Sequence, residues 1–169
     1  MPPPVICIVG NSKSGKTRLM EALIKGLKNR GLRVGALKYH KHGDFEIDVK
    51  GKDTWKYTKA GADTVAITSS LKFAVIKNEN AMTDIDEICE KYFDDIDVVL
   101  ADGFTQSDKP RIIVVEREGD EIIFERGCRV ISITEEKIKD LKLLLNCVLE
   151  FLDRPTANKN HLIDSESKV

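Results

Sequence analysis

The apolar positions of the chain follow two alternating periods. Short runs rich in β-branched residues predict strands at residues 5–9, 34–38, 64–68, 73–77, 97–101, 111–116 and 129–133. Apolar residues at helical spacing predict helices at residues 16–30, 52–60, 83–93 and 135–152. Because strand-like and helix-like segments alternate, we predict an α/β fold with a mostly parallel sheet flanked by helices.

Turn signals add one or two β-hairpins to this plan. A short polar segment joins the strands at 64–68 and 73–77, and Gly119-Asp120 separates the run at 111–116 from a further one at 121–124. After Pro155 the chain becomes polar. Since no repeat or shift in composition divides the rest, we predict a single domain over residues 1–153 and a mobile tail over residues 154–169.

Composition narrows the class of protein. A length of 169 residues suits one domain with a hydrophobic core, and a net charge of −1 lacks the basic excess of general nucleic-acid-binding proteins. The sequence shows neither an apolar run of membrane-spanning length nor a signal peptide, so we expect a cytoplasmic protein without membrane contact. The four cysteines lie far apart and are expected to be buried, reduced thiols: Cys7, Cys89, Cys128 and Cys147.

The strongest chemical signal lies between the first predicted strand and the first predicted helix. Residues 10–17, GNSKSGKT, match the phosphate-binding pattern G-x-x-x-x-G-K-[ST]. Glycines allow the backbone to approach phosphate oxygens, and N–H groups at the start of a helix supply positive charge. The expected phosphate-binding residues are Gly10, Asn11, Ser12, Lys13, Ser14, Gly15, Lys16 and Thr17. A chance match is disfavoured by the strand–helix context, so we predict a P-loop that binds a nucleoside triphosphate.

Three residues are expected to bind the triphosphate's charge and its Mg²⁺ ion at this site. Lys16 would reach the β- and γ-phosphates and stabilise the charge that builds up during phosphoryl transfer, while the Thr17 hydroxyl would ligate Mg²⁺. A second Mg²⁺ ligand usually follows a neighbouring apolar strand, and Asp102 ends the run at 97–101 in that way. The competing interpretation is that Asp102 only caps the Asp-Gly turn that follows.

A polar segment after the second predicted strand forms the third candidate site. It contains His40, His42, Asp44, Asp48, Lys52 and Asp53. P-loop proteins often place a segment here that responds to the γ-phosphate, and we favour a switch or partner-binding loop. A transition-metal site built from the histidines and acids, or a solvated connector, remains as an alternative. Asp48 is the candidate for orienting an attacking water molecule.

These motifs together resemble one known family. The run K-Y-H-K-H-x-D-F-E-I-D-x-x-G-K-D-T-W, the A-G-A-D at 60–63, and D-V-V-L-A-D-G-F ahead of K-P-R-I at 109–112 are similar to the molybdopterin-guanine dinucleotide biosynthesis protein B family. The resemblance covers residues 4–135. Two positions depart from the family pattern: Asp102 stands where many members have glutamate, and Lys13 stands where a small residue is expected.

The resemblance implies more than the residues alone show. It implies a GTP-binding adaptor with weak GTPase activity, and Mg²⁺ with GTP as its cofactors. It also implies a homodimer that acts with the molybdenum cofactor guanylyltransferase, with molybdopterin as a further ligand. Because the chain lacks an Asn-Lys-x-Asp guanine signature, the preference for GTP over ATP rests on the resemblance.

Two other functions use the same scaffold. A small-molecule kinase needs an arginine-rich lid, but the arginines of the second half, Arg111, Arg117, Arg126 and Arg129, fall in or near predicted strands. A metallochaperone GTPase would use the His-x-His loop for its cargo, but no cysteine accompanies these histidines.

Overall fold

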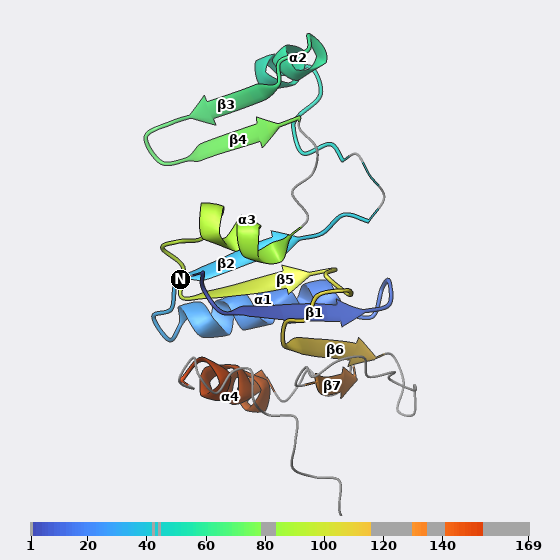
Figure 1. The fold of residues 1–169 in the computed structure, drawn as a ribbon, viewed down its shortest axis with the longest axis vertical. Coiled ribbons are helices and arrows are strands. Elements are labelled where there is room, and N and C mark those ends of the chain that lie inside the picture. Colours follow the sequence, from blue (N-terminus) through green and yellow to red (C-terminus); the bar gives the residue numbers. More distant parts are fainter. Residues whose placement is uncertain are drawn as a thin grey trace, which may run out of the picture. The chain divides into compact units, whose positions relative to one another are not determined.

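Five parallel strands form the main sheet of the protein. The computed structural model describes residues 2–41, 43, 45–78, 84–115, 130–134 and 141–153. The strands are β1 (Val5–Gly10), β2 (Val34–Lys38), β5 (Val98–Asp102), β6 (Arg111–Val115) and β7 (Val130–Thr134). Their order in the sheet is β2-β5-β1-β6-β7, and every neighbouring pair is parallel (Figure 1). The predicted parallel sheet of an α/β fold is therefore confirmed.

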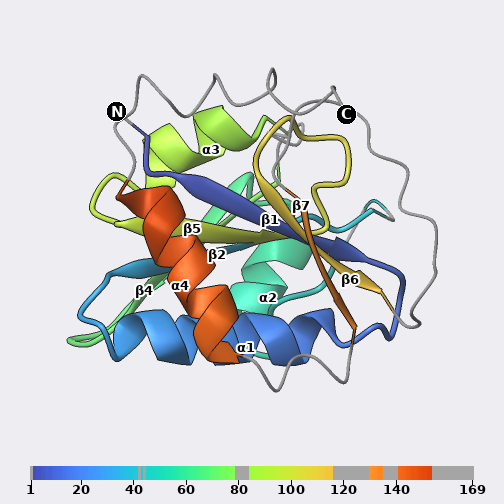
Figure 2. The ribbon, with the colours of Figure 1, turned by 90° about the horizontal axis from the view of Figure 1, so that it is seen from below.

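Helices cover both faces of this sheet. The helices α1 (Lys16–Lys28) and α4 (Leu141–Leu152) lie on one face, and α3 (Ile85–Tyr92) lies on the other (Figure 2). Successive residues of a strand point to opposite faces, so β1 contributes to both layers of the core. Ile6 and Ile8 pack with α1 and α4, whereas Val5, Cys7 and Val9 pack with α3. Both faces of β1 are therefore apolar, as expected for a central parallel strand.

A second compact unit comprises His42–Asp84, and the first comprises Met1–Lys41 with Ile85–Val169. The second unit contains α2 (Asp53–Lys59) and a hairpin of β3 (Thr64–Thr68) and β4 (Phe73–Lys77). The hairpin is antiparallel, and its register pairs Val65 with Ile76, which confirms the first predicted hairpin. The prediction of one domain over residues 1–153 with a tail over 154–169 stays a prediction, and the tail lies outside the described residues.

The second predicted hairpin also lies largely outside the described residues, which resume at Val130 after Val115. Its first strand, β6, is in place and pairs in parallel with β1 and β7. The last helix begins at Leu141 in the described part of the chain, whereas residues 135–140 of its predicted range are not described. In the part of the chain that the structure describes, no helix is long and apolar enough to cross a membrane.

Three of the four cysteines can be compared with their expected state. Cys7, Cys89 and Cys147 are reduced thiols outside any disulfide, and Cys128 lies outside the described residues. Cys7 and Cys89 are fully buried, while Cys147 is only half-buried. Burial raises the pKa of the Cys89 thiol to about 11, so this group is protonated and unreactive near neutral pH.

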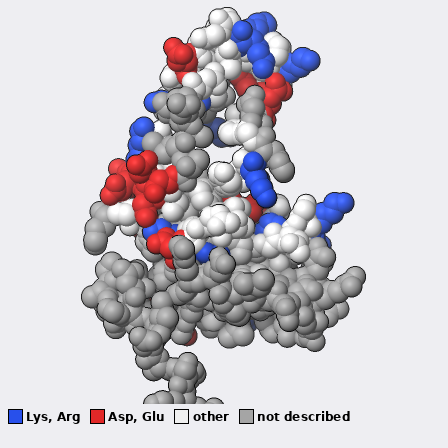
Figure 3. Space-filling model, turned by 45° about the vertical axis from the view of Figure 1, so that its right-hand side comes forward, with Lys and Arg blue, Asp and Glu red and all other residues white. Residues whose placement is uncertain are grey.

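Charged side chains are distributed unevenly over the surface. On the face shown in Figure 3, the largest cluster of acidic side chains lies at the left, smaller acidic patches lie elsewhere, and basic side chains are scattered. The helix α3 contributes exposed acids, and two of them, Asp86 and Glu87, lie in its first turn. Negative charge at this position stabilises a helix, because it opposes the partial positive charge of the free N–H groups.

An ion pair fastens β2 to β5 at the amino ends of both strands. The Arg33 guanidinium lies 2.9 Å from an oxygen of Asp97, and the Arg33 backbone N–H donates to the other oxygen of Asp97 at 2.7 Å. The hydrogen bond from the Arg33 side chain is the largest of the effects that lower the pKa of Asp97 below its ordinary value.

This lowered pKa predicts a pH dependence of stability. The unfolded state binds the proton of Asp97 more tightly than the folded state does, so the pair stabilises the fold above the ordinary aspartate pKa of about 3.9. The contribution is lost as the pH falls through the lower folded-state pKa. We expect Arg33→Met to unfold more readily than the unsubstituted protein at pH 7, and the difference to shrink below about pH 4. Urea unfolding across this pH range measures the effect, and a difference that is independent of pH would contradict it.

Candidate nucleotide-binding site

The loop between β1 and α1 has the backbone of a phosphate cradle. Gly10 has a φ of +152° and Gly15 a φ of +91°. A Cβ on Gly10 would overlap the Val114 carbonyl oxygen of the neighbouring strand and lie 2.9 Å from the Ser14 hydroxyl. Lys13 has a φ of +68° and is the only non-glycine residue with a positive φ in the described part of the chain. The loop therefore adopts a tight turn that most side chains would forbid at its two glycines.

The amino end of α1 faces this loop with its N–H groups uncapped. Gly15 occupies the N-cap position, no side chain caps the helix, and its first turn contains no acidic residue. The first N–H groups of a helix have no partner within the helix and carry partial positive charge. A bound phosphate would supply the hydrogen-bond acceptors that this end of α1 lacks.

Two polar side chains of the loop, those of Lys16 and Ser14, have surroundings that suit a bound anion. The Lys16 ammonium donates hydrogen bonds to the carbonyl oxygens of Gly10, at 2.8 Å, and Asn11, so it lies folded over the loop. Ser14 is buried, and its hydroxyl oxygen has no hydrogen-bond partner among the described residues. A buried hydroxyl without a partner is costly, and an anion in the cradle would remove that cost.

Asp102 lies at the same edge of the sheet as this loop. It ends β5 and is in register with Ile8 of β1, two residues before Gly10. Its carboxylate is buried and accepts a hydrogen bond from the Lys38 ammonium at 2.8 Å. The turn after it is closed by a different contact, in which the Thr105 N–H donates to the Gly103 carbonyl oxygen at 2.9 Å. The Asp102 carboxylate is therefore paired with Lys38 and does not close the turn, and it lies at the carboxyl edge, where ligands of parallel sheets bind.

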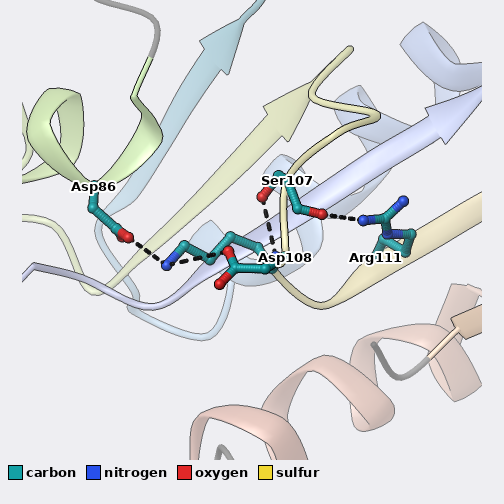
Figure 4. A network of polar contacts seen from close by, with 5 residues as sticks. Asp86, Ser107, Asp108 and Arg111 are labelled. Carbon is teal, nitrogen blue, oxygen red and sulfur yellow. Dashed lines mark hydrogen bonds and ion pairs between the residues drawn. The ribbon is translucent and has the colours of Figure 1, made fainter. Parts of the chain in front are cut away.

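A polar network, whose role the sequence did not reveal, holds the segment that follows Asp102 (Figure 4). Arg111 donates to the carbonyl oxygen of Thr105, at 3.0 Å, and to that of Ser107. The Lys109 backbone N–H donates to the Ser107 hydroxyl at 3.0 Å, and its ammonium lies 2.6 Å from Asp86 of α3. The only sequence feature that pointed to this segment was the K-P-R-I motif at residues 109–112. The motif does not predict that its basic side chains contact the preceding loop.

The predicted switch segment is divided between the two compact units. His40 is exposed and belongs to the first unit, whereas Asp48, Lys52 and Asp53 belong to the second. His42 and Asp44 lie outside the described residues. Among the residues that the structure describes, no group of three or more histidines, cysteines or acids could hold a metal ion.

The acids of the second unit have different surroundings. Asp53 lies in the first turn of α2, with Lys52 at the N-cap position, and pairs with Lys56 at 3.2 Å. Asp48 accepts a hydrogen bond from the Val49 N–H through one oxygen, and its other oxygen is buried without a hydrogen-bond partner among the described residues. The position of Asp53 is therefore explained by its favourable interaction with the start of α2. Asp48, in contrast, has one carboxylate oxygen that accepts no hydrogen bond from the described residues.

Comparison with known proteins identifies the family. The sequence model of the family described as "Molybdopterin guanine dinucleotide synthesis protein B", or MobB, matches residues 5–136. This chain belongs to the MobB family. A solved structure described as molybdopterin-guanine biosynthesis protein B is 29% identical in sequence, with a TM-score of 0.66, and covers 89% of this chain and 99% of its own. The MobB structure of Bacillus subtilis, at 23% identity and a TM-score of 0.65, shares the fold.

Similar proteins from several organisms have the same description as molybdopterin-guanine dinucleotide biosynthesis adapter proteins. A "Molybdopterin-guanine dinucleotide biosynthesis adapter protein" of Haemophilus influenzae is 33% identical over 116 residues, which cover 68% of this chain and 65% of the relative. The chain thus spans about two thirds of that relative's length. An adapter protein of the same description from Escherichia coli is 27% identical over 169 residues and covers 89% of this chain and 94% of its own.

Proposed function

We propose that the protein is a nucleotide-binding adaptor in molybdopterin guanine dinucleotide biosynthesis, with GTP and Mg²⁺ as its ligands and weak GTPase activity. The main support for this proposal is the loop at Gly10–Thr17. It combines glycines at positive φ, a buried Ser14 hydroxyl and the uncapped start of α1, and the chain is a member of the MobB family. The adaptor role and the choice of GTP come from the relatives' description and the family resemblance.

The residues around the cradle suit a triphosphate. When a triphosphate binds, the Lys16 ammonium would leave the two carbonyl oxygens of the loop and donate to phosphate oxygens instead. Phosphate oxygens are stronger acceptors because they carry negative charge. Thr17 is exposed at the start of α1, and Asp102 lies at the neighbouring strand end, so these two would hold Mg²⁺. When bound, Mg²⁺ neutralises charge on the β- and γ-phosphates. Asp48 stays the proposed residue for orienting the attacking water, on the ground of its place in the segment after β2.

Surface chemistry supports the proposed homodimer. In the hairpin, residues opposite one another share a face, so Ala66 with Val75 and Thr68 with Phe73 form one side of the sheet. The large apolar residues exposed in this unit are Phe45, Ile47, Val49, Tyr57, Ile67, Leu71, Phe73 and Val75. So many in one small unit mark an association surface, and a second copy is the occupant that we propose. The second partner is the molybdenum cofactor guanylyltransferase, with molybdopterin as the shared ligand.

One experiment separates this function from the kinase and the metallochaperone. Purified protein is titrated with fluorescent GTP and ATP analogues, with and without Mg²⁺, and then assayed with the guanylyltransferase and molybdopterin. We expect Mg²⁺-dependent GTP binding. For a variant with His40 and His42 both replaced by alanine, we expect GTP affinity within about 1 kcal/mol of the unsubstituted value, because the backbone of the loop still holds the phosphates. The same variant is expected to lose support of guanylyl transfer.

The rival functions predict different results. A metal cargo site predicts stoichiometric Zn²⁺ or Ni²⁺ by elemental analysis, which the double variant loses. A kinase predicts phosphoryl transfer to a small molecule without any protein partner. Either result, or support of guanylyl transfer by the double variant at the full rate, would contradict the proposed role of the segment.

A further inference from the structure

The Lys38 ammonium pairs with Asp102, the proposed ligand of Mg²⁺. Lys38 ends β2 and Asp102 ends β5, and the two residues are in register in the parallel sheet. The ammonium lies 2.8 Å from Oδ2 of Asp102. The two side chains differ in exposure, at 69% for Lys38 and 11% for Asp102. A buried carboxylate needs a cation or hydrogen-bond donors, and a long exposed side chain supplies one that can leave at low cost.

The backbones around this pair are held independently of it. The Tyr39 N–H donates to the Asp102 carbonyl oxygen at 2.8 Å, and the Tyr39 and Phe104 rings lie 5.4 Å apart. Gly103 has a φ of +91°, and a Cβ on it would lie 2.9 Å from the Tyr39 carbonyl oxygen. The two strand ends are therefore packed closely by their main chains. Only the Lys38 side chain has to move for the Asp102 oxygen to change its partner.

We propose that Lys38 is a placeholder cation, which neutralises Asp102 in the metal-free protein and leaves it when Mg²⁺ and a nucleoside triphosphate bind. This inference rests on the proposed function. A divalent ion and an ammonium repel each other and compete for one buried oxygen, so Lys38 weakens the binding of Mg²⁺ while it stabilises the protein without it. Lys38 thus sets how strongly nucleotide binding depends on the metal.

The exchange would act on the segment that enters the second compact unit. Lys38 is followed by three residues before this unit begins at His42, so release of Lys38 frees a side chain at the entry of the unit. The chain returns at α3, where Asp86 is paired with Lys109 at 2.6 Å (Figure 4). This second pair does not involve Asp102, so we expect the exchange at Asp102 to leave it unchanged.

The test compares Lys38→Met with a matched control, Arg33→Met. Arg33 and Asp97 pair the same two strands at their opposite ends, so the control also removes a cation–carboxylate contact between β2 and β5. Calorimetry measures the affinity for a non-hydrolysable GTP analogue with and without Mg²⁺. We expect the ratio of the two affinities to rise about tenfold in Lys38→Met and to stay unchanged in Arg33→Met and in Lys38→Arg, which keeps the charge.

Thermal unfolding supplies a readout that does not depend on nucleotide. Lys38→Met should lower the Tm of the metal-free protein, and Mg²⁺ should raise it more than it raises the Tm of the unsubstituted protein. The double variant with Asp102→Asn and Lys38→Met should have the same ratio of affinities with and without Mg²⁺ as Asp102→Asn alone. The carboxylate for which the ammonium and the metal compete is absent from both. An unchanged or lower ratio in Lys38→Met would overturn the inference alone. Absence of Mg²⁺-dependent binding in the unsubstituted protein would overturn the proposed function and the inference with it.

Discussion

Replacing Lys16 with alanine is expected to lower the affinity for a nucleoside triphosphate by about 3 kcal/mol, or roughly a hundredfold. The lost contact is charge-assisted, and no other side chain of the loop carries an ammonium folded over its carbonyl groups in the described structure. The fold should survive, because Lys16 contributes neither to the core layer of α1 nor to the sheet. Calorimetry measures the affinity, and circular dichroism checks the fold.

Lys28→Ala is the control for this prediction. Lys28 lies in the last turn of the same helix, is exposed and carries the same charge, but it is at the end of α1 away from the cradle. We expect it to bind the nucleotide almost as well as the unsubstituted protein does. Equal affinity for the Lys16 variant and the control would show that the loop does not bind phosphate through Lys16.

The second large effect is expected for Gly10→Ala. The new Cβ would overlap the Val114 carbonyl oxygen, which belongs to the backbone of β6 and cannot rotate away as a side chain would. The loop or the strand pairing must shift, and we expect a loss of about 3 kcal/mol or more in the free energy of unfolding. Nucleotide binding should be lost as well, since the shift displaces the cradle. Urea unfolding and calorimetry measure the two effects.

Gly31→Ala separates overlap from backbone strain. Gly31 follows α1 with a φ of +83°, and a Cβ there would meet no atom within 4 Å. This substitution should cost only the strain of a left-handed backbone, about 1–2 kcal/mol, and should leave nucleotide binding intact. If both variants lost the same stability, close packing against β6 would not be the reason for a glycine at position 10.

Local sequence was sufficient for most of the elements and for the cradle. The strands β2, β3 and β4 begin and end at the predicted residues, and β3 and β4 are rich in β-branched residues, which favour a strand. The phosphate cradle is equally local, since Gly10, Gly15 and Lys16 are required by the geometry of one turn. Helix ends were less accurate: α1 ends at Lys28 and not at Arg30, because the Leu27 and Lys28 carbonyl oxygens accept from the Arg30 and Gly31 N–H groups in a tighter closing turn.

Contacts between distant segments could not be predicted in this way. The pairing of Lys38 with Asp102 depends on β2 and β5 being adjacent in the sheet and on their register. The residues that flank Lys38 and Asp102 in the sequence determine neither of these. The same holds for Arg111, whose guanidinium folds back on Thr105 and Ser107, and for Lys109 with Asp86. The sequence analysis did not single out His42–Asp84 as a compact unit, because no shift in composition marks its ends.

The hairpin unit and the main sheet are expected to differ in local stability. A two-stranded sheet on one short helix is only marginally stable in water, and Val65 is the sole residue of that unit among the described buried apolar residues. The main sheet, by contrast, is enclosed by apolar layers on both faces. Sub-global unfolding that opens the hairpin while the five parallel strands stay closed therefore requires less free energy than opening the whole chain. We therefore expect the two units to open in separate cooperative steps, with the smaller free energy for the hairpin unit, which is inserted between β2 and α3.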